Sequence, residues 1–156
     1  MKEAIGGTWL FQIVIVFILL FTAFMCLSIN RSKAYGVKDD IIQILEDNKC
    51  FRLGETSNSF ASEIKETMKN ISYRTQGKCS EGYIGYDREG NVLQNEKSSA
   101  AFCIKKIDVG SKSAQLPDEY YYKVEVFYQL DLPIFNSIFN FKINGDTAII
   151  YPKTCK

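Results

Sequence analysis

The stretch Trp9–Ile29, WLFQIVIVFILLFTAFMCLSI, contains 21 consecutive residues without a formal charge. An α-helix of that length is ~31 Å long, which matches the ~30 Å hydrocarbon core of a bilayer. A buried helix of a globular domain would show a polar stripe, but the polar positions here are only Gln12, Thr22 and Ser28. A cleaved secretory signal is the nearest alternative, although its apolar region is usually ~7–15 residues long. The stretch therefore predicts a transmembrane helix over residues 8–29.

The composition of the 156-residue chain excludes several functional classes. Its 19 basic and 18 acidic side chains give a net charge of +1, so we expect no nucleic-acid partner. The chain has no histidine, which excludes a Ser-His-Asp triad, a Cys-His dyad and a histidine-ligated zinc site. Asp87, Glu89 and Asn91 resemble the start of a calcium loop but lack its later bidentate carboxylate. We therefore expect neither an enzyme nor a bound metal or cofactor.

Helical periodicity continues beyond the charge-free stretch. Apolar residues at i, i+4, i+7 and i+8 predict that one helix covers residues 9–48 and is amphipathic in its second half. These residues are Val37, Ile41, Ile44 and Leu45. Ser57-Asn58-Ser59 would cap a second helix, and its apolar stripe would consist of Phe60, Ile64, Met68 and Ile71.

After residue 72 the apolar period changes to two, which is typical of β-strands. The strand candidates are Tyr83–Tyr86 and Val92–Leu93 as a hairpin, then Ala101–Val109, Tyr120–Leu132, Phe139–Ile143 and Thr147–Tyr151. Asn144-Gly145 is a strong hairpin signal, so we expect a turn there between the last two strands. In Tyr120–Leu132, the polar face that alternates with the apolar one includes Lys123, Glu125, Gln129 and Asp131.

These elements define the fold class as α+β, with a long N-terminal helix packed against a small antiparallel β-sheet. No repeat, low-complexity tract or linker divides residues 30–156. We therefore expect residues 30–156 to form one head domain.

The charges and the cysteines disagree about the side of the membrane on which this head lies. Arg31, Lys33 and Lys38 follow the apolar stretch, and the positive-inside rule would place them in the cytoplasm. Four cysteines lie beyond the stretch, and this even number indicates two disulfides in an oxidising compartment. They are Cys50, Cys79, Cys103 and Cys155. We give the cysteines more weight and predict an extracytoplasmic head.

Four cysteines allow three pairings, and four free thiols are a further alternative. We favour Cys79–Cys103, because this bridge would close the predicted hairpin region. We also favour Cys50–Cys155, because it would fasten the last strand to the end of the long helix. Each bridge would stabilise the domain by roughly 3–5 kcal/mol.

The N-terminus resembles that of type IV pilin-like proteins, whose short leader ends in glycine and is removed by a prepilin peptidase. Residues 1–7, MKEAIGG, would be the leader, so that Gly7 precedes the cleaved bond and Thr8 becomes the first mature residue. The family pattern has glutamate at the fifth mature position, where this chain has Gln12. An amide keeps hydrogen-bonding capacity for subunit registry at a lower cost of membrane insertion than a carboxylate.

The C-terminal part is similar to TadE-like minor pilins, or pseudopilins, of tight-adherence pilus systems in Gram-positive bacteria. The likeness lies in Tyr122–Ile134, YKVEVFYQLDLPI, followed by Phe139–Phe141 and Gly145–Thr147. The low arginine count, with 4 Arg against 15 Lys, is compatible with an AT-rich genome of that kind.

The resemblance implies a structural subunit of a type IV or Tad-like pilus or secretion assembly, held in the cell membrane with its head outside. Its partners would be the lipid bilayer, other pilin-like subunits, the assembly machinery and a prepilin peptidase. The alternative is a single-pass membrane protein whose extracytoplasmic domain binds a partner unrelated to pili.

Overall fold

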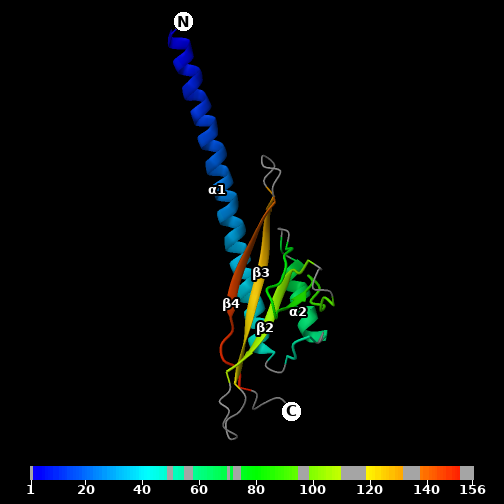
Figure 1. Ribbon diagram of the computed structural model, residues 1–156. Helices are drawn as coiled ribbons and strands as arrows, with labels where there is room; N and C mark the ends of the chain where they lie inside the picture. Colours follow the sequence, from blue (N-terminus) through cyan, green and yellow to red (C-terminus); the bar gives the residue numbers. More distant parts are fainter. Residues whose placement is uncertain are drawn as a thin grey trace.

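The computed structural model describes residues 2–48, 51–54, 58–69, 71, 75–94, 99–109, 119–131 and 138–151. Within these residues, two helices precede four strands (Figure 1). The helices are α1 (Lys2–Asp47) and α2 (Asn58–Lys69), and the strands are β1 (Ile84–Tyr86), β2 (Phe102–Asp108), β3 (Tyr120–Asp131) and β4 (Ile138–Asp146). The α+β fold class predicted from the sequence is confirmed.

Helix α1 is a single unbroken helix of 46 residues, about 69 Å long. We call residues 7–29 the first half of this helix and residues 30–47 its second half. The first half extends away from the sheet, whereas the second half lies along it (Figure 1). Ala34, Val37, Ile41 and Leu45 are buried against the sheet, as their spacing along one helical face predicts. At the end of the helix, the side-chain amide of Asn48 donates a hydrogen bond to the Ile44 carbonyl oxygen at 2.9 Å.

Helix α2 buries three residues of the apolar stripe predicted for it, namely Phe60, Ile64 and Met68. The fourth, Ile71, lies beyond the end of the helix and is partly buried against the same core. Arg88 from the turn after β1 donates hydrogen bonds to the Met68 and Ile71 carbonyl oxygens at 3.1 and 3.0 Å. These bonds fasten the turn after β1 to the C-terminal end of α2 and to the residue just beyond it. Gly90, at φ +80°, lets the same turn approach α2, where an added Cβ would lie 2.9 Å from Ala61 Cα.

The four strands form an antiparallel meander in the order β1-β2-β3-β4. One face of this sheet packs against the second half of α1 and contributes most of the main core. Aromatic rings fill the centre of that core: Phe51, Phe60, Tyr86, Phe102 and Tyr122. The buried Tyr122 hydroxyl donates a 2.6 Å hydrogen bond to the Phe51 carbonyl oxygen, which ties the end of α1 to β3.

The hairpin predicted at Asn144-Gly145 is wrong. Strand β4 runs straight through both residues, and they pair with Glu125 and Val124 of β3. Gly145 lies close to α1, because an added Cβ would be 2.7 Å from Lys38 Cδ and 2.8 Å from Ile42 Cδ1, and these side chains would have to shift to admit it. The chain after Asp146 continues beside the start of β3, where Tyr120 and Ile150 form a bridge.

Strand alternation predicted the face on which Glu125 lies but not how that face is covered. The Glu125 side chain does lie on the face away from α1, but it is 2% exposed. The segment around Gly77–Ser80 crosses this second face, and an added Cβ at Gly77 would overlap the Phe127 ring. The outer face of the sheet is therefore partly a second, smaller core, formed by Ala100, Cys103 and Phe127.

Candidate functional site

Most of the large apolar side chains that are exposed in the described residues lie on the first half of α1. Its large apolar side chains point outward on all sides, and Trp9, Phe17 and Phe24 are each about two-thirds exposed. By length and composition this is the one helix in the described residues that could cross a membrane. None of its most apolar 18-residue window is buried inside the chain, so it is not a core helix of this domain.

The residues predicted to control processing and registry lie on this exposed half. Gly7 and Gln12 are both within α1 and exposed, and an added Cβ at Gly7 would meet nothing within 4 Å. Thr8 is exposed one residue further along the helix. Their roles in cleavage and assembly remain predictions.

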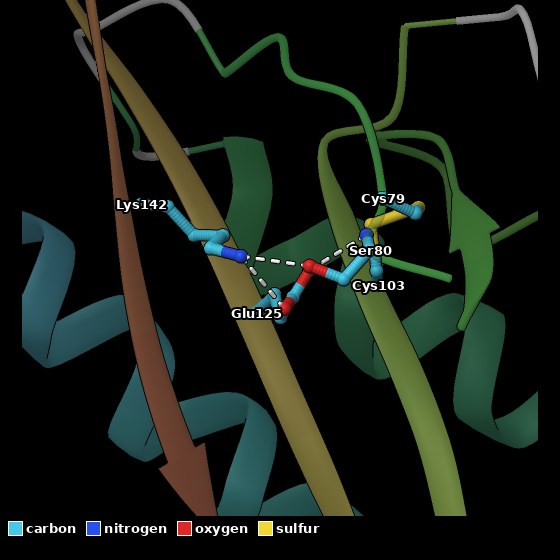
Figure 2. Close-up of a disulfide and its surroundings, with 5 residues drawn as sticks. All are labelled: Cys79, Ser80, Cys103, Glu125 and Lys142. Atoms are coloured by element: carbon cyan, nitrogen blue, oxygen red, sulfur yellow. Dashed lines mark hydrogen bonds and ion pairs between the residues drawn. A yellow bond between two sulfur atoms is a disulfide. The ribbon is translucent and has the colours of Figure 1, made fainter. Parts of the chain in front are cut away.

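A covalent and electrostatic cluster lies on the opposite face of the sheet from α1 (Figure 2). Cys79 and Cys103 form a disulfide with a Cα–Cα distance of 5.7 Å. This pairing confirms the prediction for these two residues. Cys50 and Cys155 lie outside the described residues, so their predicted bridge stays a prediction.

Glu125 is held next to the disulfide by two partners. Its two carboxylate oxygens accept hydrogen bonds from the Ser80 backbone N–H at 3.1 Å and from Lys142 Nζ at 3.0 Å (Figure 2). Lys142 also donates to Ser80 Oγ at 2.7 Å. Cys103 and Glu125 are direct cross-strand neighbours, so the disulfide and the ion pair fasten the same segment to the same point of the sheet.

This cluster has the features of a structural clamp. Both Glu125 oxygens are satisfied and its charge is paired, which a buried carboxylate requires. Within the described part of the chain, no group of three histidine, cysteine or acidic side chains could hold a metal ion. Sequence reasoning missed Glu125, because alternation assigns a residue to a face but does not show what covers that face.

The Asp87–Asn91 segment, which resembles the start of a calcium loop in sequence, forms a tight turn. Asp87 Oδ1 accepts hydrogen bonds from the backbone N–H groups of Glu89 and Asn91 at 2.9 and 2.8 Å. Asp87 Oδ2 accepts another from the Asn91 side chain at 3.0 Å. The carboxylate is therefore used to hold the turn itself.

Comparisons with protein-family models, with curated proteins and with solved structures found no match to this chain.

Proposed function

We propose that this chain is a membrane-anchored, pilin-like subunit, structural in role, of a type IV or Tad-like pilus or secretion assembly. In this proposal residues 8–29 cross the cell membrane and residues 30–156 form an extracytoplasmic head. Assembly would then move the exposed half of α1 from lipid into contact with the corresponding helices of other subunits.

The unbroken α1 is the observation that carries the proposal. One helix is both the spine of the head and the exposed apolar extension, so a force on either part is transmitted directly to the other. An apolar surface on all sides of the first half suits lipid and suits a bundle of similar helices, because both environments are apolar. The length of α1 therefore supports a subunit that changes partners without refolding.

The disulfide supports the proposed location of the head. Disulfides persist in oxidising compartments and are rare in the cytosol. Cys103 is fully buried and joined to Cys79, so its side of the disulfide lies inside the folded head. This favours the outside for residues 30–156 against the opposite indication from Arg31, Lys33 and Lys38.

A second function is favoured by a hollow of about 630 Å³ on the head. It is lined by residues 78–85, Leu93 and Gln94 and has the size of a small-molecule or peptide site. This hollow, together with Gln12 in the place of a glutamate, favours the alternative function, that of a single-pass membrane protein that binds an extracytoplasmic partner.

Shearing of intact cells that produce the chain with its assembly machinery tests the proposal. We expect the chain in the sheared surface fraction, with Thr8 as its first residue by mass spectrometry. An integral membrane protein of the same cells serves as the control for lysis. A chain that stays in the membrane fraction while protease still digests its head from outside would reject the pilus role and favour the partner-binding alternative.

A further inference from the structure

A groove where cationic and aromatic side chains meet lies at the end of the head nearest the apolar stretch. It has a volume of about 320 Å³ and lies between α1 and the β3–β4 pair. Helix α1 contributes Leu27, Arg31 and Tyr35, and the sheet contributes Tyr128, Phe141 and Asn144.

The groove lies at the depth of lipid headgroups if Trp9–Ile29 crosses a bilayer. Leu27 belongs to the charge-free stretch, whereas Arg31 follows its last residue by two positions, or ~3 Å along the helix. The headgroup layer is about 5–7 Å thick on each side of the hydrocarbon core. The guanidinium of Arg31 would therefore lie among lipid phosphates.

Most N–H donors of the Arg31 guanidinium are available to bind a ligand. Its side chain donates one long hydrogen bond to the Tyr35 hydroxyl at 3.4 Å and lies 5.6 Å from the Tyr35 ring centroid. Across the described ranges of the chain, no carboxylate forms an ion pair with it. A guanidinium carries five N–H donors, and two of them can bind a phosphate together. Lys142, by contrast, is already paired with Glu125.

Aromatic rings give the groove a fixed wall. The Tyr128 and Phe141 rings stack at 5.0 Å between β3 and β4. On α1, Tyr35 lies under Arg31 and also under Lys38, whose Nζ is 5.4 Å from the ring centroid. Aromatic side chains are enriched at membrane–water boundaries, where one end of a site is apolar and the other is wet.

We propose that this groove binds one anionic phospholipid of the leaflet that faces the head. Arg31 holds the phosphate, and the first part of an acyl chain lies along Leu27. The inference rests on the membrane placement of α1 in the proposed function. It also gives Arg31, one of the three cations after the apolar stretch, a role in lipid binding that is compatible with an extracytoplasmic head.

The test uses the full-length chain in vesicles made from equal parts of phosphatidylglycerol and phosphatidylcholine. After release into a mild detergent, native mass spectrometry counts the lipids retained by each chain. We expect preferential retention of phosphatidylglycerol and about a fivefold loss of that preference in Arg31→Gln. Lys33→Gln is the matched control, because Lys33 is an exposed cation on α1 that does not line the groove.

Three results would overturn the lipid site. These are equal retention of the two lipids, an equal loss in Lys33→Gln, and displacement of the lipid by inorganic phosphate, which would indicate a site for free anions. Flotation separates the two proposals. A chain that floats with vesicles but has no lipid preference contradicts only the groove, whereas a chain that does not float contradicts the membrane anchor as well.

Discussion

The first half of α1, residues 7–29, and its second half, residues 30–47, share one helix but differ in what surrounds them. In the first half, Phe17 is 66% exposed, and apolar side chains occur on every side. In the second half, Ile41 is fully buried, and apolar side chains form one stripe against the sheet. The angular width of the apolar surface, more than its total hydrophobicity, distinguishes a helix built for an apolar surrounding from one built for a core.

The comparison also separates two kinds of stabilisation. The second half of α1 contributes to the folding of the head, because its side chains are buried only when the sheet forms. Apart from Leu27, which packs against the core at the junction, the large apolar side chains of the first half are exposed in the isolated chain and would be buried only by lipid or another protein. Substitutions in the two halves should therefore affect different measurements.

Truncation of a matched residue pair should show the largest difference. Ile41→Ala removes fully buried methyl groups and should lower the free energy of unfolding of the head by about 2–5 kcal/mol. Ile15→Ala, in the exposed half, should change it by less than about 0.5 kcal/mol. Urea unfolding of the full chain in mild detergent, followed by the near-ultraviolet circular dichroism of the tyrosines, measures both. Similar losses in the two variants would refute the division of the helix.

Cysteine substitutions in the head and in the first half of α1 should differ in the same way, with a somewhat smaller loss in the free energy of unfolding. Replacing Cys79 and Cys103 together by alanine opens a bridge between residues 24 positions apart and should destabilise the head by about 3 kcal/mol. Cys26→Ala is the control, because Cys26 is a free, exposed cysteine on the first half of α1. Its unfolding curve should match that of the unmodified chain, and unchanged stability in the double variant would contradict the role of the clamp.

Alkaline pH should lower the free energy of unfolding of the head, because the buried Tyr122 hydroxyl keeps its proton. Burial raises the pKa of the Tyr122 hydroxyl above its usual value near 10. Above pH ~10 the unfolded chain releases this proton while the folded head retains it, so the free energy of unfolding falls by up to about 1.4 kcal/mol per pH unit. Below that pH the contribution is fully present.

The Tyr122→Phe variant isolates this effect from the titration of lysines and other tyrosines. It should lose about 1 kcal/mol at neutral pH with the hydrogen bond to Phe51, and its stability should fall less steeply above pH ~10. Parallel pH profiles for the two chains would show that Tyr122 is not responsible.

The sequence was most informative where one periodicity had one physical cause. The spacing of Val37, Ile41 and Leu45 predicted the face of α1 that packs on the sheet. The positions of Cys79 and Cys103 beside neighbouring strand candidates predicted their bridge. Each inference needed only local geometry, which sequence spacing contains.

The errors arose where distant segments meet. Gly145 follows asparagine, as in many hairpins, but here the glycine admits Ile42 of α1 against β4. Glu125 has the spacing of a solvent-facing residue, but the segment that includes Ser80 covers it. Periodicity carries no information about these long-range approaches, since they depend on how whole elements pack.

The single tryptophan tests the central claim most directly, because all tryptophan emission reports on Trp9 at the start of the apolar stretch. In vesicles of brominated phosphatidylcholine, the emission of Trp9 should be quenched relative to unbrominated vesicles. A second chain, with Trp9→Phe and Tyr121→Trp, places the probe on the head and should show no quenching. Equal emission of Trp9 in the two kinds of vesicle would contradict a membrane-embedded first half of α1.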